Sequence, residues 1–366
     1  MAAAGVGVLL TVPVAVPAQA DAVRDSMWHL GSLKISQVHK LAQGEGMKVA
    51  VLDSGVDANH PDLTGAVLPG IDGWTAKKDG RTDEDEVRHG TGIAALIAGR
   101  GHGPGNTAGI LGVAPKAQVL PVGVWPPGST DVRPDNLAVG IRWAVDQGAA
   151  VICIAGGGVP DSEARQAIRY AAQRNVPVVA AAGNRPSRFV QFPGSDRQAF
   201  GIGAVDRSGK AWSGSVTGPE VDLTAPGTDI QVPKPGGGYV AVDGTSASTA
   251  LVAGTLVLVR ERYPNLTVEQ LYNRMKATAV DRGPAGADEQ YGWGVIDPLA
   301  ALTAPVDGEP ASPTAADPPA TPRAEPGGSA DGGGVPAAVI IAAAGFALAV
   351  VGGLVVLLLV RRRRTS

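Results

Sequence analysis

Three residues stand beside apolar segments in positions that suit nucleophilic catalysis. Asp53 ends the apolar run VAVLD, and an acid at the end of a buried strand is held rigidly enough to orient an imidazole. His89 opens the segment HGTGIAALIAG, and histidine supplies a general base whose pKa lies near working pH. Ser246 precedes a long apolar segment, and the free N–H groups at a helix start favour the negative charge that develops when a hydroxyl attacks.

Each of these three residues also has an ordinary structural explanation. Aspartates are common at strand ends, histidines cap helices or lie on surfaces, and serine is a common N-cap. A fourth segment, VVAAAGN at 178–184, favours the catalytic interpretation because it runs a buried strand into Asn184. An exposed Asn amide at that place can donate a hydrogen bond to an oxyanion, and losing such a donor costs about 3 kcal/mol of transition-state stabilisation.

The elements that must hold these side chains are short apolar runs that alternate with helical patterns. Strands are predicted at 47–52, 118–124, 151–154, 177–181, 200–205 and 221–223. Helices are predicted at 90–98, 135–147, 162–174, 246–263 and 267–279, with Asp135 as one N-cap and Thr267 with Gln270 as a capping box. Strands that are apolar throughout and alternate with helices predict a mostly parallel sheet covered on both faces, with ligands at the carboxyl ends of the strands.

The sequence around the four residues resembles the signature segments of the subtilases. The matching segments are VAVLDSGVDANHPDL (49–63), HGTGIAALIAG (89–99), VVAAAGN (178–184) and DGTSASTALVAG (243–254), in the subtilisin order. The resemblance extends to 109–124, 221–227 and 291–302, and so covers essentially the whole body of the chain. It implies a subtilisin-like three-layer α/β fold with a mostly parallel sheet, and a serine endopeptidase that hydrolyses peptide bonds.

The resemblance also implies a role for each residue. Ser246 would attack the scissile carbonyl, His89 would take its proton and pass it to the leaving amine, and Asp53 would fix the His89 tautomer. Asn184 and the Ser246 backbone N–H would hold the oxyanion. The substrate backbone would lie as an added strand beside segments near 123–128 and 154–158. The implied substrate-binding residues are Gly123, Ala155, Gly156, Gly157 and Gly183, with Gly156 and Gly157 leaving room for the first specificity pocket.

Two positions depart from the family pattern. Ala250 stands where the family usually has proline, and Ala155 stands where it usually has serine. These changes touch helix geometry and the substrate rim but leave the reacting groups in place, so an active enzyme is expected. The alternative is a slow or non-catalytic scaffold that stabilises a secretion complex. An α/β-hydrolase esterase is excluded, because it needs a G-x-S-x-G elbow and the chain order Ser, Asp, His.

Both ends of the chain predict a protein that leaves the cytoplasm and stays at the cell membrane. Residues 1–20 read as a signal peptide ending in a small-x-small site, although no Lys or Arg precedes the apolar run; a buried strand or helix is the alternative. Residues 335–360 carry no charge and are long enough to span a bilayer, and the arginines of the tail 361–366 favour the cytoplasmic side. Residues 303–334, rich in Pro, Ala and Gly, predict a disordered linker. The peptidase domain, 21–302, is therefore expected outside the cytoplasm.

This layout is similar to that of the mycosins, the subtilases associated with type VII secretion in actinobacteria. The similarity rests on Trp28-His29-Leu30, about twenty residues before the Asp53 segment, and on the linker, single span and basic end. It implies a type VII secretion membrane complex as a partner, beside protein or peptide substrates.

Composition narrows the remaining function classes. The formal net charge of -3 argues against nucleic acid as a partner, because phosphate binding needs a basic surface. The single cysteine, Cys153, allows no intramolecular disulfide and lies in an apolar run that predicts burial. No acidic cluster has clear ligand spacing, so neither a metal nor a cofactor is expected.

Overall fold

The computed structural model describes residues 18–73, 79–86, 88–125, 134–234 and 237–309. Residues 1–17 of the predicted signal peptide, residues 310–334 of the predicted linker, and the whole predicted span and tail lie outside this part of the chain. Within the described ranges, no helix combines the length and the apolar character that crossing a membrane requires.

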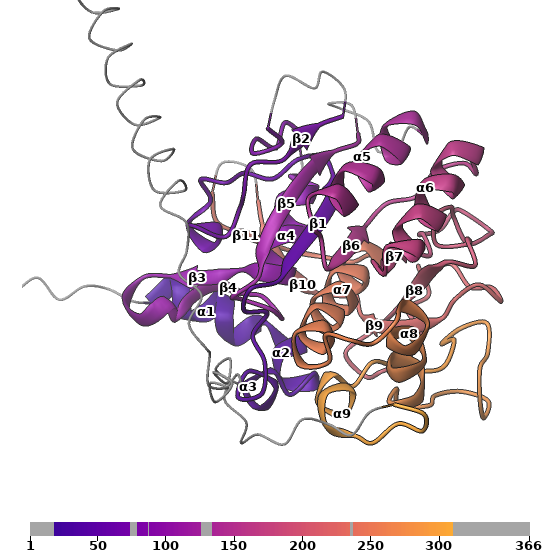
Figure 1. The fold of residues 1–366 in the computed structure, drawn as a ribbon. Helices are drawn as coiled ribbons and strands as arrows, with labels where there is room; N and C mark the ends of the chain where they lie inside the picture. The colour runs from indigo at the N-terminus through magenta and orange to yellow at the C-terminus, as the bar shows by residue number, and fades with distance from the viewer. Residues whose placement is uncertain (1–17, 74–78, 87, 126–133, 235–236, 310–366) are drawn as a thin grey trace, which may run out of the picture. The chain divides into compact units, whose positions relative to one another are not determined.

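A seven-stranded sheet runs through the folded unit, and every neighbouring pair of its strands is parallel (Figure 1). In spatial order the strands are β2 (Ile71–Asp72), β5 (Gln118–Gly123), β1 (Lys48–Asp53), β6 (Val151–Ile154), β7 (Val178–Ala181), β8 (Ala199–Val205) and β9 (Leu223–Pro226). The strands that follow β1 in the sequence lie on both sides of it in the sheet, with β2 and β5 on one side and β6 to β9 on the other. Such a reversal of strand order opens a crevice at the carboxyl ends of the strands. The predicted mostly parallel sheet is therefore confirmed.

Two predicted boundaries are wrong. The strand predicted at 221–223 is β9, which pairs with β8 from Leu223 to Pro226. Pro226 is tolerated because β9 is an edge strand, where a missing N–H costs no ladder bond. The helix predicted to follow an Asp135 cap is α5 (Pro134–Asp146), so Asp135 lies in the first turn and not before it. Proline suits the first turn, where its missing N–H has no helical partner anyway.

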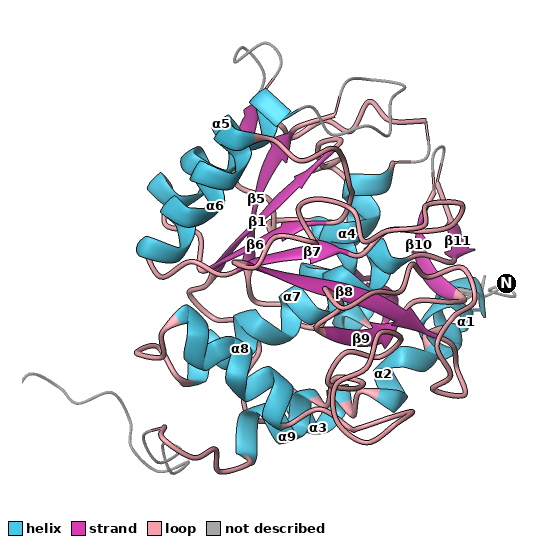
Figure 2. Ribbon diagram, turned by 90° about the vertical axis from the view of Figure 1, so that its right-hand side faces the viewer, coloured by secondary structure: helices cyan, strands magenta, loops and turns pink. Residues whose placement is uncertain are grey.

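Helices cover both faces of the sheet (Figure 2). α5 and α6 (Ser162–Gln173) pack together on one face, and α4 (His89–Ala98) packs with α7 (Thr245–Arg262) on the other. α8 (Val268–Ala277) and α9 (Pro298–Thr303) lie beside α7. β1 serves both layers, since Val49 and Val51 belong to the core with α4 and α7, while Ala50 and Leu52 belong to the core with α5 and α6. This alternation completes a three-layer α/β arrangement.

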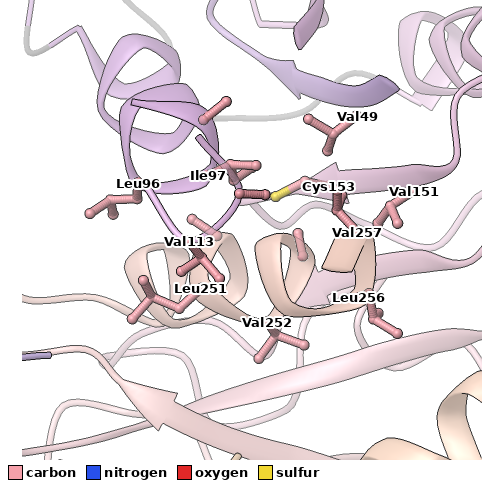
Figure 3. Close-up of a cluster of buried hydrophobic side chains, with 14 of the residues drawn as sticks. Val49, Leu96, Ile97, Val113, Val151, Cys153, Leu251, Val252, Leu256 and Val257 are labelled. Atoms are coloured by element: carbon pink, nitrogen blue, oxygen red, sulfur yellow. The ribbon is translucent and has the colours of Figure 1, made fainter. Parts of the chain in front are cut away.

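α7 is buried along nearly its whole length (Figure 3). Its apolar side chains meet Val151 and Cys153 of β6, and Cys153 is fully buried as predicted. Burial raises the pKa of the Cys153 thiol well above its usual value. Thr249 donates a hydrogen bond from its hydroxyl to the Thr245 carbonyl at 2.7 Å, so a polar side chain is satisfied inside the core. Ala250, also fully buried, continues the helix without a break.

Short elements complete the described unit. The N-terminal helices are α1 (Ala18–Ser26), α2 (Trp28–Ser32) and α3 (Ile35–Val38), and single 3-10 turns cover Pro61–Leu63 and Pro104–Asn106. Two hairpins are formed by β3 (Arg100–His102) with β4 (Ala108–Leu111), and by β10 (Ile230–Pro233) with β11 (Tyr239–Val242). The β10–β11 hairpin packs against α4 and forms one wall of the cavity described below.

Candidate active site

Asp53 and His89 form a hydrogen-bonded pair at the carboxyl end of β1. Asp53 is fully buried, and His89 Nδ1 lies 2.9 Å from its Oδ1 and 3.0 Å from its Oδ2. The Ser54 backbone N–H donates to Asp53 Oδ1 at 2.8 Å and holds the carboxylate in place. Gly90 lets α4 begin against this strand end, because a Cβ there would lie 2.1 Å from the Gly55 carbonyl oxygen. The pair predicted from sequence is therefore brought into contact by the end of β1 and the start of α4.

A buried acid that the sequence analysis missed fixes the start of α4. Asp83 accepts hydrogen bonds from the Thr91 N–H at 2.9 Å, from the Thr91 hydroxyl at 2.6 Å and from the Ser54 hydroxyl at 2.9 Å. Burial raises the pKa of Asp83 in spite of these hydrogen bonds. Asp85 accepts from the His89 N–H at 3.1 Å. The acidic run DEDE at 83–86 was the available signal for such a role.

The protonation of His89 reflects two opposing effects. Partial burial of the ring lowers its pKa, while the charge and hydrogen bond of Asp53, with smaller contributions from Asp85 and Asp83, raise it. The attraction outweighs the burial, so the pKa of His89 lies above its usual value of 6.5. The His89 ring remains 27% exposed, and it lines the cavity into which a substrate would bind.

Ser246 and Asn184 meet at the start of α7. Asn184 Oδ1 accepts from the Thr245 N–H at 3.0 Å and from the Thr245 hydroxyl at 3.0 Å, and that hydroxyl accepts from the Gly183 N–H at 3.2 Å. Because a backbone N–H can only donate, this contact assigns Oδ1 and leaves Nδ2 for another acceptor. A Cβ placed on Gly244 would lie 2.9 Å from Ser246 Oγ and 3.7 Å from both Ser246 N and Asn184 Nδ2. Because Gly244 has no side chain, a space remains there that is bounded by the Ser246 hydroxyl, the Ser246 backbone N–H and the Asn184 amide.

His89, Asn184 and Ser246 line one cavity of about 650 Å³. Of the substrate-binding residues predicted from sequence, Ala155, Gly156, Gly157 and Gly183 also line it. Gly123 does not line it, because it is buried as the last residue of β5 and pairs with Asp53 on one side and Asp72 on the other.

Two further cavity residues, one inside the predicted segment 123–128 and one that was not predicted, occupy the space beside the predicted glycines. The Trp125 ring lies near the His89 ring at a tilt of 41°, with centroids 5.0 Å apart, and a Cβ on Gly156 would lie 2.2 Å from Trp125 Cζ2. A Cβ on either Gly157 or Gly183 would lie 2.5 Å from Gln191 Oε1, and Gly183 has a φ of +102° that favours glycine. Trp125 follows β5 at a carboxyl end, which was a usable signal. Nothing local marks Gln191, which the loop between β7 and β8 brings back to the cavity.

Among the described residues, no group of three or more His, Cys, Asp or Glu side chains is placed to hold a metal ion. The described cavity brings together groups that can carry out acyl transfer: a hydroxyl, a histidine oriented by a buried carboxylate, and two N–H donors near the hydroxyl.

The described body is similar to proteins with known activity. Over 278 residues it is 34% identical to Subtilisin Savinase of Lederbergia lenta, and the alignment covers 75% of this chain and 97% of that protein. It is 36% identical over 231 residues to thermitase of Thermoactinomyces vulgaris, covering 62% of this chain and 79% of the relative.

The fold is also similar to that of solved proteases. The crystal structure of MycP1 from Mycobacterium smegmatis has a TM-score of 0.68 and 29% sequence identity, covering 84% of this chain and 92% of that one. The MycP3 protease from the type VII (ESX-3) secretion system has a TM-score of 0.66 and 29% identity, covering 79% of this chain and 91% of that one. The Peptidase_S8 (Subtilase family) model matches residues 44–294. The chain therefore belongs to the subtilase family of serine peptidases.

Proposed function

We propose that Ser246, His89 and Asp53 are the catalytic triad of an active endopeptidase. Ser246 Oγ attacks the carbonyl carbon of the scissile peptide bond while its proton passes to His89 Nε2. Asp53 holds the His89 Nδ1–H, so that Nε2 is the nitrogen free to accept. His89 then returns the proton to the leaving nitrogen, the C–N bond breaks, and an acyl-enzyme remains. Water attacks this ester with His89 again as base, which releases the acid and restores the Ser246 hydroxyl.

The observation that carries the proposal is the space left by Gly244. Ser246 Oγ, Ser246 N and Asn184 Nδ2 all border it, at 2.9 to 3.7 Å from the position of the missing Cβ. An oxyanion formed by attack of Ser246 would develop next to its own N–H and the Asn184 amide, where two donors stabilise it. A scaffold has no need of such a space. The departure at Ala250 does not disturb it, since Ala250 lies inside an unbroken α7.

We also infer that the peptidase acts outside the cytoplasm, tethered by residues 335–360, in a mycosin-like role. The uncharged stretch and the arginines after it support the tether. MycP1 and MycP3 are described as belonging to type VII secretion systems, which supports such a complex as the partner.

Labelling with a fluorophosphonate probe tests the proposed nucleophile. The full-length chain should form a covalent adduct at Ser246, and Ser246→Ala should form none, because only an activated serine hydroxyl displaces the fluoride. Ser208→Ala, at an exposed serine outside the cavity, is the matched control and should label like the parent chain. If a folded parent chain does not label, the catalytic proposal fails and the scaffold alternative replaces it.

A further inference from the structure

One wall of the cavity combines an apolar floor with an acidic rim. The floor is built by Ile93 of α4 and by Val232 and Val242 of the β10–β11 hairpin, with Val240 at the edge, 43% exposed. These side chains come from two elements that pack against each other, since a Cβ on Gly92 would lie 3.3 Å from Val232 Cβ. The wall therefore offers methyl groups to a substrate side chain.

The rim of the same wall carries three carboxylates. Asp85 and Glu86 stand just before α4, and Asp243 stands at the end of β11. Asp85 and Asp243 each accept a backbone N–H, but neither they nor Glu86 form an ion pair with a described residue. The only described cation that lines the cavity is Arg88, and it is already paired with Asp57. Within the described ranges, the rim therefore carries negative charge that no ion pair neutralises.

We propose that this wall selects a lysine or arginine side chain of the substrate. This inference rests on the proposed peptidase function and names its substrate class. The methylene stem of Lys or Arg packs on the valines while its charged head reaches the carboxylates, which is how such side chains lie at apolar surfaces with polar edges. A neutral side chain of the same length gains only the apolar contact. An acidic side chain is repelled, which adds discrimination.

The position of the wall limits which substrate residue it selects. His89 belongs to the same helix start as the acidic rim and must reach the leaving nitrogen. The selected side chain therefore belongs to a residue next to the scissile bond or one position removed from it. The opposite side of the cavity, with Gly157 and Gln191, has no carboxylate among the residues that line it in the described part of the chain.

Positional-scanning octapeptides test the selection. Each position near the scissile bond carries Lys, norleucine or Glu in turn, because norleucine keeps the methylene stem and lacks the charge. At one position the full-length chain should cleave the Lys peptide with roughly tenfold higher kcat/KM than the norleucine peptide, and the Glu peptide should be poorest. Equal rates for Lys and norleucine at every position would overturn the inference.

Charge-removing variants assign the selection to the wall. Glu86→Gln with Asp243→Asn should reduce the Lys preference roughly threefold or more, and added salt should reduce it in the parent chain. Glu289→Gln removes one exposed carboxylate outside the cavity and should leave the preference unchanged. A preference that survives the double variant intact would contradict the assignment.

A binding measurement separates this inference from the proposed function. Fluorescence polarisation with the Lys and norleucine peptides on Ser246→Ala reports selection without turnover. Normal fluorophosphonate labelling with equal binding of the two peptides would refute the basic selection and leave the peptidase standing. Absent labelling with stronger binding of the Lys peptide would refute catalysis and retain the selection.

Discussion

At the scale of single residues, the orientation of the His89 ring is fixed by neighbours on three sides. Asp53 lies at 2.9 Å from Nδ1, the Asp85 carboxylate holds the His89 N–H, and the Trp125 ring lies against the imidazole. Trp125 is 6% exposed, and its Nε1 has no hydrogen-bond partner among the residues that the structure describes. The ring thus packs as an apolar surface that limits how far the imidazole can rotate away from Asp53.

The pH dependence of kcat/KM should report the His89 pKa. Protonated His89 cannot accept the Ser246 proton, so activity falls as pH drops through the raised pKa, with a midpoint above 6.5. Asp85→Asn keeps an oxygen for the His89 N–H but removes a charge that raises this pKa, so the midpoint should move to lower pH.

The matched control is Asp161→Asn at the N-cap of α6, which should leave the midpoint in place. A midpoint that Asp85→Asn leaves unchanged would mean that Asp85 does not influence His89.

Asp53→Asn should lower kcat/KM by roughly 10⁴-fold, because it removes the carboxylate that fixes the reactive tautomer.

At the scale of elements, the short helix α2 is anchored through one residue and buried through the next. Trp28 donates from Nε1 to the Thr228 carbonyl at 3.0 Å, which ties α2 to the loop before β10. His29 is fully buried, and neither ring nitrogen has a hydrogen-bond partner in the described part of the chain. Burial lowers the pKa of His29 to about 4, so the ring is neutral in the folded chain near pH 7.

His29 should make the folded chain sensitive to acid. The pKa of His29 is about 6.5 in the unfolded chain and about 4 in the folded chain. The contribution of neutral His29 to the free energy of unfolding is therefore fully present above pH 6.5 and is lost as the pH falls toward 4. The shift corresponds to a loss of about 3 kcal/mol. His29→Leu should remove this slope from urea unfolding curves of the full-length chain, and His29→Phe tests the same change with a ring retained. Variants that keep the parent slope would show that other groups cause it.

At the scale of the whole molecule, the cavity depends on elements far apart in the sequence. Its walls come from the start of α4, the ends of β5, β6 and β7, the β10–β11 hairpin and the start of α7. The parallel sheet brings the ends of β5, β6 and β7 together, since the carboxyl ends of parallel strands meet at one edge of the sheet. The hairpin packs on α4 and adds the acidic and apolar wall.

The proposed tether makes a prediction for intact cells. A tag inserted between residues 309 and 310 should be digested by protease added to spheroplasts, whereas a tag after Ser366 should be protected, because the arginines keep that end in the cytoplasm. Lysis of the same spheroplasts should expose both tags, as the control. Digestion of the C-terminal tag in intact spheroplasts would overturn the tether or its orientation.

Much of the fold could be predicted because its signals are local. Apolar runs and helical spacing predicted six of the seven sheet strands and the principal helices, with a boundary error at β9. The capping box of Thr267 and Gln270 is present, with hydrogen bonds of 2.9 and 3.2 Å. The hairpin β10–β11 was not predicted, because its strands are short, β11 is partly exposed, and the hairpin gains its stability from packing on α4.

The sequence by itself determined the family, and it predicted Asp53, His89, Asn184 and Ser246 as the site residues, since each lies in a motif that can be recognised without its partners. Only the tertiary structure decided which other residues share their cavity. It excluded Gly123, which two neighbouring strands enclose, and it added Trp125, Gln191 and the acidic wall. The physical reason is that these neighbours are joined by packing between distant segments, and spacing along the chain carries no record of such contacts.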